Sequence, residues 1–250
     1  MTPVDQDDDR FASWLATEAG RRLLALRAGF EGDDKSLAAE GDRLSHEYIV
    51  SQLLEHRPQD TVVSEEDGAS VEGPPPPSRH WLIDPLDGTR EYSESRPDFA
   101  VHVALVVDGV ARTGAVALPA EDLVLATDAP PRLASRPAGP LRLLVSRTRP
   151  PAEATAVANL LSAELIGMGS AGVKAMAVVR GLGDVYLHAG GQYEWDSAAP
   201  VAVAIAAGAH ASRLDGSPIR YGQRDAWLPD LLVCRPEFVT QILGALSSVR

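Results

Sequence analysis

Two stretches near the start of the chain carry apolar residues at helical spacing. The first follows the acidic run Asp7–Asp9, which suits a helix N-terminus, and ends at Gly29. Its apolar face is formed by Phe11, Trp14, Leu15, Leu23 and Leu26. The second predicts a helix from about Asp42 to His56, with Pro58 just beyond it. Asp42 therefore stands near the start of the second helix, where it could simply be a capping residue.

The pattern then changes to short apolar or alternating runs, which are typical of strands. The predicted strands lie at Thr61–Ser64, Phe99–Val107, Val110–Leu118 and Leu123–Thr127. Asp108-Gly109 between two of them is a strong hairpin signal. Pro74–Pro77 would form a stiff polyproline connector within the loop Gly68–Ser78, although a binding site for a partner domain is conceivable. This part of the chain therefore contains antiparallel sheet.

Ala129–Pro140 is rich in proline and alanine and is the best candidate for an internal boundary. After it, strands are predicted at Leu141–Val145, Leu165–Met168 and Asp184–Leu187. Helices are predicted at Pro151–Leu161, Val173–Arg180, Ser197–Ala207 and about Pro236–Ser247, and a loop at Gly190–Asp196. Such alternation is typical of α/β structure. We predict one compact unit with an N-terminal α+β half, residues 1–132, and a C-terminal α/β half, residues 133–250.

The polar positions converge most clearly in Trp81-Leu82-Ile83-Asp84-Pro85-Leu86-Asp87-Gly88-Thr89-Arg90. Its apolar start predicts a buried strand, which should break at Asp84-Pro85 because proline cannot continue a ladder. Two carboxylates that converge at a turn need a cation nearby. Gly88 permits close backbone approach, and Asp-Gly-Thr suits the start of a helix whose N–H groups could face a phosphate. The simpler alternative is an Asx turn followed by a helix cap.

Charge and composition narrow the possible functions. The net charge of −12 argues against a nucleic-acid polymer as partner, but it allows a small anionic substrate if metal ions supply local positive charge. Cys234 is the only cysteine, so no intramolecular disulfide and no cysteine zinc site is expected. We predict no membrane segment, since apolar runs are short and the N-terminus is acidic. A cytoplasmic enzyme fits these features.

Further acids could join the two carboxylates of the central stretch. Glu65-Glu66-Asp67 follows a predicted strand, although such a run is often a solvated turn, and Asp196 would by default be a helix cap. Glu65, Asp84 and Asp87 all follow strands, so one sheet could bring them together. Oxygen ligands of this kind suit magnesium. His102 lies on a predicted strand, where a packed histidine is more common than a catalytic one.

In combination these motifs resemble the lithium-sensitive, magnesium-dependent phosphomonoesterases related to inositol monophosphatase. The family pattern is an acidic pair after a strand, then Asp-Pro-Ile/Leu-Asp-Gly-Thr, then a distant Trp-Asp. Here it stands as Glu65-Glu66, Asp84–Thr89 and Trp195-Asp196. The resemblance implies the layered αβαβα sandwich of the inositol monophosphatase and fructose-1,6-bisphosphatase type. Arg90-Glu91 and the segment His188–Asp196 make the chain most similar to the CysQ-type bisphosphate nucleotidases, including actinobacterial ones.

The resemblance also implies roles for individual residues. The metal ligands, for two or three Mg²⁺ ions, would be Glu65, Asp84, Asp87, Asp196 and the backbone carbonyl of Leu86. Asp42 and Thr89 would position and deprotonate the attacking water, with Glu65 also counted as catalytic. Substrate would contact Asp87, Gly88, Thr89, Arg90, Lys174 and Asp196. The chain departs from the nucleotidase pattern at Ser170-Ala171, where the serine often stands one position later.

The implied reaction is hydrolysis of 3′-phosphoadenosine 5′-phosphate (PAP) to AMP and phosphate by metal-activated water, in sulfur assimilation or nucleotide recycling. PAPS, inositol monophosphate and fructose 1,6-bisphosphate remain alternative substrates, and the resemblance allows a homodimer. A haloacid dehalogenase type enzyme fits less well, because it needs two aspartates two residues apart, whereas Asp84 and Asp87 are three apart. A non-catalytic metal- or nucleotide-binding regulator is the alternative of another class. Arg90 could also be an ordinary surface residue paired with Glu91 or Glu94.

Overall fold

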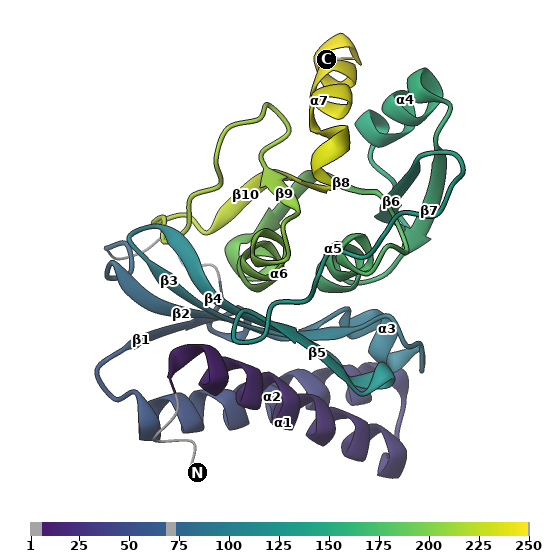
Figure 1. Ribbon diagram of the computed structural model, residues 1–250. Helices are drawn as coiled ribbons and strands as arrows, with labels where there is room; N and C mark the ends of the chain where they lie inside the picture. Colours follow the sequence, from purple (N-terminus) through teal and green to yellow (C-terminus); the bar gives the residue numbers. More distant parts are fainter. Residues whose placement is uncertain (1–6, 69–73, 250) are drawn as a thin grey trace.

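The computed structural model describes residues 7–68 and 74–249 and arranges them in alternating layers of helices and sheets (Figure 1). In order, the layers are helices α1 (Asp8–Gly29) and α2 (Asp34–His56), a first sheet, helices α5 (Ala171–Val179) and α6 (Glu194–Ala206), a second sheet, and helices α4 (Ala152–Leu161) and α7 (Val239–Val249). This is the αβαβα sandwich that the sequence predicts. Each sheet is therefore covered on both faces, as its largely apolar strands require.

The first two helices cover the outer face of the first sheet. Asp7 caps α1 by accepting a hydrogen bond from the backbone N–H of Arg10 at 3.0 Å. The predicted start of the second helix at Asp42 is wrong, because α2 begins at Asp34 with Asp33 as its cap. Only Leu37 and Gly41 are buried before Asp42, so this part of the helix shows little apolar periodicity. Asp42 therefore lies well inside a helix and is not a cap.

The first sheet has the strand order β1-β2-β3-β4-β5. Its strands are β1 (Thr61–Ser64), β2 (Arg79–Asp87), β3 (Ala100–Val107), β4 (Val110–Leu118) and β5 (Leu123–Ala126). β1 and β2 are parallel, and the other neighbours are antiparallel. The hairpin at Asp108-Gly109 is confirmed, since both residues have positive φ, 51° and 76°, as a tight hairpin turn requires.

The central motif does not end its strand where the sequence suggests. β2 continues to Asp87, and only its register against β3 is interrupted between Asp84 and Asp87. Pro85 cannot donate to the ladder, so the strand skips Pro85 and Leu86 and then pairs again. The short helix α3 (Thr89–Ser93) follows, with Gly88 before it at φ +89°. The two carboxylates therefore lie on one strand, at either side of a bulge.

The second sheet has the order β7-β6-β8-β10-β9. Its strands are β6 (Arg142–Ser146), β7 (Glu164–Met168), β8 (Val185–Tyr193), β9 (His210–Ser212) and β10 (Trp227–Cys234). The predicted loop at Gly190–Asp196 is wrong, because β8 runs to Tyr193 and α6 begins at Glu194. Gly190 and Gly191 have φ near +95° and lie where β8 bulges against β10, so glycines typical of a loop stand inside a strand.

Three apolar clusters hold the layers together. One packs α1 and α2 on the first sheet, a second fills the space between the sheets around α5 and α6, and a third lies under α4 and α7. The predicted loop Gly68–Ser78 falls partly on residues 69–73, outside the described residues. Among the helices of residues 7–68 and 74–249, none combines the length and apolar content needed to span a membrane.

Candidate active site

Four carboxylates meet where the two sheets approach each other. Glu65 begins the 3₁₀ helix Glu65–Asp67 directly after Ser64, and Ser64 pairs with Ile83, the residue before Asp84. The parallel register of β1 and β2 thus places Glu65 next to Asp84, and the charge of Glu65 contributes to the raised pKa of Asp84. Asp196, in the first turn of α6, acts electrostatically on both Glu65 and Asp84. The structure brings these distant residues together as the sequence predicts.

Burial and mutual repulsion disfavour the ionised forms of Asp84 and Asp196 in the protein alone. Burial, followed by the negative charges of Glu65, Asp87 and Asp196, raises the pKa of Asp84 far above its usual range. Burial and Asp87 raise the pKa of Asp196 to about 7. Asp84 is 1% exposed, so solvent cannot screen this repulsion. A buried group of mutually repelling oxygen ligands fits a divalent cation, which would relieve the repulsion.

Asp87 differs from its neighbours because donors surround it. Burial alone would raise its pKa, but His102 in its protonated form, Lys174 and Ser170 together hold the pKa of Asp87 below its usual range. Its Oδ2 atom accepts hydrogen bonds from Ser170 Oγ at 2.5 Å and from the backbone N–H of Gly172 at 2.7 Å. These donors come from the start of α5, so the second half of the chain fixes a carboxylate of the first.

Asp42 and Thr89 lie on the other side of the motif. Thr89 Oγ1 is 3.4 Å from Asp42 Oδ1 and 3.0 Å from the backbone carbonyl of Leu86, so its one hydroxyl proton has two acceptors. Burial and the charges of Glu65 and Glu66 raise the pKa of Asp42 to about 8. Helix α2 is tied to the motif by Ser45 Oγ, which donates to the carbonyl of Pro85 at 2.7 Å.

Above the carboxylates lies a pocket of about 800 Å³. Asp87, Gly88 and Asp196 line it from below, and Lys174, His188 and Trp227 belong to its walls. Gly88 is required here, because its φ of +89° favours glycine and a Cβ atom would come within 3.2 Å of the carbonyl of Asp98. The pocket is large enough for a small organic phosphate.

The basic residues of the pocket are held in different ways. Arg90 Nε pairs with Glu94 Oε1 at 3.0 Å, which is the surface pairing left open by the sequence. Lys174 is buried, and its Nζ donates to the carbonyls of Gly169 and Ser170 at 3.1 and 2.5 Å. Arg149 is exposed, lines the pocket, and within the described part of the chain has no carboxylate at ion-pair distance.

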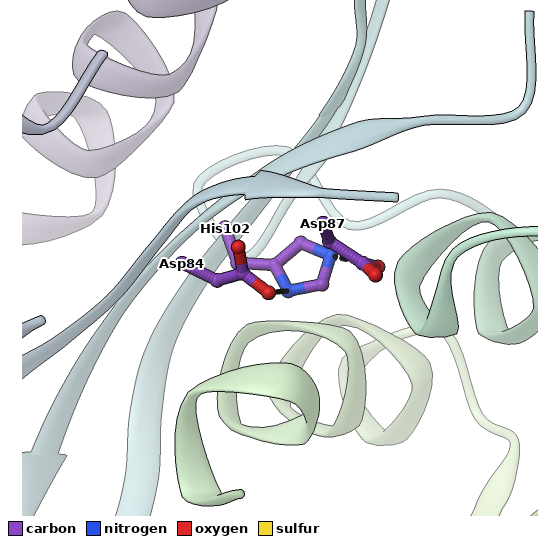
Figure 2. A group of neighbouring side chains, drawn as sticks. All are labelled: Asp84, Asp87 and His102. Carbon is purple, nitrogen blue, oxygen red and sulfur yellow. Dashed lines mark ion pairs between the residues drawn. The ribbon is translucent and has the colours of Figure 1, made fainter. Parts of the chain in front are cut away.

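Sequence patterns gave His102 no role in the site, yet it lies between the two carboxylates of the motif (Figure 2). It stands opposite Asp84 on the neighbouring strand, is 0% exposed, and has Nε2 3.1 Å from Asp87 Oδ2. Its Nδ1 is 3.3 Å from the carbonyl of Trp195. Cross-strand pairing was the only signal, and it requires knowing the register of β2 and β3, which the bulge disturbs.

Comparison with known proteins agrees with this geometry. The model of the inositol monophosphatase family matches residues 6–246. The chain is 46% identical to the 3′-phosphoadenosine 5′-phosphate phosphatase of Mycobacterium leprae, with 97% of this chain and 94% of that protein covered. It is 30% identical to the 3′(2′),5′-bisphosphate nucleotidase CysQ of Escherichia coli K12, covering 86% of this chain and 94% of that protein.

Solved structures show the same fold. The crystal structure of CysQ from Bacteroides thetaiotaomicron, a bacterial member of the inositol monophosphatase family, superposes with a TM-score of 0.78. Its sequence is 26% identical, and the match covers 90% of this chain and 96% of that one. The inositol monophosphatase of Thermotoga maritima has a TM-score of 0.76 at 19% identity, covering 96% of each chain.

Proposed function

The chain belongs to the inositol monophosphatase family, in its CysQ-type branch, and we propose that it is a phosphatase that removes the 3′-phosphate of PAP to give AMP and phosphate. The observation that carries this proposal is the buried carboxylate cluster, of which Asp87 and Asp196 line a pocket of about 800 Å³, in a chain similar to a PAP phosphatase over nearly its whole length. Its cofactor would be Mg²⁺, two or three ions per site.

In this proposal, Glu65, Asp84, Asp87, Asp196 and the carbonyl of Leu86 hold the cations. A bound divalent cation would stabilise charge on the phosphoryl oxygens and promote ionisation of the attacking water. The mutual repulsion of the buried carboxylates supports this assignment, because a cation would favour the ionised forms of Asp84 and Asp196 that burial and neighbouring carboxylates disfavour.

Asp42 and Thr89 would handle the proton of the attacking water. The Thr89 hydroxyl lies within 3.4 Å of Asp42, so it can orient water and pass a proton to the carboxylate. As the water oxygen forms its bond to phosphorus, its proton would leave toward this pair, while the departing 3′-oxygen takes a proton from solvent. Glu65, close to both Asp42 and Asp84, would assist in placing the water. No nucleophilic side chain is needed.

The backbone N–H groups of Gly88 and Thr89 would hold the scissile phosphate, and the rim of the pocket would receive the second one. Arginine suits a phosphate because its planar fork donates paired hydrogen bonds. Arg149 has its charge available, whereas Arg90 must share Glu94 with Arg147. Lys174 would act through the backbone carbonyls it holds, which belong to the segment that also binds Asp87.

Phosphate release from PAP tests the proposal. The purified protein should release phosphate in the presence of magnesium and none in excess chelator, and millimolar lithium should inhibit it. Phosphate release that does not depend on magnesium would favour a different hydrolase. Binding of PAP without turnover would favour a non-catalytic regulator. PAPS, inositol monophosphate and fructose 1,6-bisphosphate are the alternative substrates to compare. A homodimer, a cytoplasmic location and the boundary at residue 132 stay predictions.

A further inference from the structure

His102 is the one side chain of the cluster that the family motif does not include. It comes from β3, which contributes no other residue to the proposed site, and it is completely buried. We propose that its Nε2 atom is a direct ligand of the cation held by Asp84 and Asp87, so that this metal site contains a nitrogen donor beside its carboxylate oxygens. The proposal rests on the metal-dependent function proposed above.

The first argument is the spacing of the donor atoms. Asp84, Asp87 and His102 each offer one ligand atom, and these atoms lie within 4.8 Å of one another. Ligands that share one ion at bond lengths near 2.0–2.4 Å lie at most roughly 4–5 Å apart. The imidazole lies between the two carboxylates, with Nδ1 on the side of Asp84 and Nε2 on the side of Asp87 (Figure 2). Their arrangement therefore suits one shared ion.

The second argument is that Nε2 has no other occupation. It lies 3.1 Å from Asp87 Oδ2, yet it makes no hydrogen bond within the described residues, so an N–H there would not point at that oxygen. A buried polar atom without a partner is costly. Asp87 Oδ2 is already bound by Ser170 and Gly172, which leaves its other oxygen for a cation. A cation would satisfy both the nitrogen and the carboxylate.

The third argument is the partner of the opposite ring nitrogen. Nδ1 lies 3.3 Å from the carbonyl of Trp195, which can only accept a hydrogen bond. This contact places the proton of a neutral imidazole on Nδ1 and leaves the lone pair on Nε2. Metal-binding histidines in proteins usually donate their second N–H to such a carbonyl, because this fixes the ring and its tautomer. Trp195 precedes Asp196, so the same contact ties His102 to another proposed ligand.

The position of the imidazole also depends on a glycine packed against Nε2. A Cβ atom on Gly172 would lie 2.1 Å from Nε2, so any larger residue would close this side of the ring. Gly172 thus avoids a clash with the nitrogen, and its backbone N–H binds Asp87. The competing arrangement is an imidazolium that forms ion pairs with both carboxylates, at 3.1 and 3.7 Å, and excludes the cation from this position.

A nitrogen donor changes the metal preference. Imidazole binds zinc and other later first-row ions better than magnesium, which prefers oxygen. His102→Asn should therefore weaken Zn²⁺ binding about tenfold or more and Mg²⁺ binding much less. Titration of the metal-free protein with each ion, followed calorimetrically, measures both affinities without using activity.

Pulsed electron paramagnetic resonance of the protein loaded with Mn²⁺ alone tests the bond itself. Wild-type protein should show coupling of the manganese electron spin to a nitrogen nucleus, and the pattern should change on selective ¹⁵N-histidine labelling. The coupling should vanish in His102→Asn and persist in His188→Asn, which alters a histidine of the pocket whose Nε2 already bonds the Gly191 carbonyl at 2.8 Å.

The wild-type spectrum decides the question even if a variant fails to fold. Bound Mn²⁺ without coupling to a histidine nitrogen would overturn the role of His102 as a ligand and favour the imidazolium. The proposed magnesium-dependent phosphatase function would not be contradicted by that result. A coupling that survives in His102→Asn would equally overturn it. Failure to bind any divalent ion would instead contradict the proposed function.

Discussion

The carboxylates at the base of the pocket and the arginines on its rim differ in how firmly the fold holds them. Asp84 and Asp87 are 1% and 8% exposed and lie on one strand; the backbone N–H of Leu86 on that strand donates to Asp84, and that of Gly172 in α5 donates to Asp87. Arg90 is 68% exposed and reaches its partner through a flexible stem. Backbone geometry thus fixes the positions of the carboxylates. The positions of the arginines depend on the partners with which their long side chains pair. We therefore expect substitutions of the carboxylates to abolish phosphate hydrolysis, and substitutions of the arginines to change the preference among substrates.

The largest expected effect comes from the base. Asp87→Asn keeps the shape of the side chain but removes an anion from the proposed cation site, so activity on PAP should fall about a thousandfold, equivalent to several kcal/mol. The fold should persist, as circular dichroism can check. Glu66→Gln is the matched control, since it removes an exposed charge near the same cluster and should cost little. Near-normal turnover of Asp87→Asn at limiting magnesium would contradict the assignment.

A smaller effect is expected at the rim. Arg149→Ala should lower kcat/KM for PAP about tenfold to a hundredfold, the usual worth of a hydrogen bond to a charged group. Arg90→Ala should lower it less, because Arg90 must leave Glu94 to reach the substrate. Both variants should act much less on inositol monophosphate, which has one phosphate.

The ratio of the two efficiencies on one variant separates selectivity from damage to the metal site. Equal losses on both substrates would show that the arginine supports the structure and does not select the nucleotide. A larger loss of kcat/KM for PAP in Arg90→Ala than in Arg149→Ala would indicate that Arg90, and not Arg149, binds the second phosphate.

The last expected effect concerns the stability of the folded protein without metal. Burial and the charges of Glu65 and Glu66 raise the pKa of Asp42 to about 8 in the folded protein. The folded state therefore keeps a proton that the unfolded chain has lost, and stability falls as the pH rises from about 4 to 8. The slope is at most about 1.4 kcal/mol per pH unit for one proton.

Urea unfolding in chelator measures this effect. The stability of Asp42→Asn relative to wild type should increase between pH 5 and pH 8, since the variant lacks the titrating carboxyl. Comparing the two proteins at each pH cancels the contribution of the other groups, including the buried histidines. A stability difference that is constant with pH, or that reverses sign, would mean that the Asp42 carboxylate is not penalised in the fold.

Sequence reasoning reached the base of the pocket because backbone chemistry fixes it. Asp-Pro-Leu-Asp-Gly-Thr combines a residue that interrupts pairing with one that adopts φ of +89°, so its carboxylates have few possible placements. The order of strands and helices predicted an α+β half and an α/β half, and the layered fold followed from the resemblance to the inositol monophosphatase family. The pairing of Arg90 with Glu94 was left open, because an exposed arginine next to several acids has many partners.

His102 and the extent of β8 were missed for a different reason. His102 joins the cluster through the register of β2 and β3, which depends on a bulge that no local pattern specifies. Gly190 and Gly191 predict a loop, but tertiary pairing with β10 keeps them in a strand. Helix α2 begins before Asp42, at its Asp33 cap, and this first part has too little apolar periodicity to be predicted from the sequence. Long-range strand pairing and helix capping determine these three features, and the spacing of apolar residues alone does not predict them.

Relative kcat/KM for PAP, inositol monophosphate and fructose 1,6-bisphosphate, measured with saturating magnesium and with product identification, tests the central claim most directly. We predict that PAP is the best substrate and that it yields AMP with loss of the 3′-phosphate, because the rim of the pocket carries a charge for a second phosphate. A preference for inositol monophosphate, or formation of adenosine 3′-phosphate from PAP, would contradict this account.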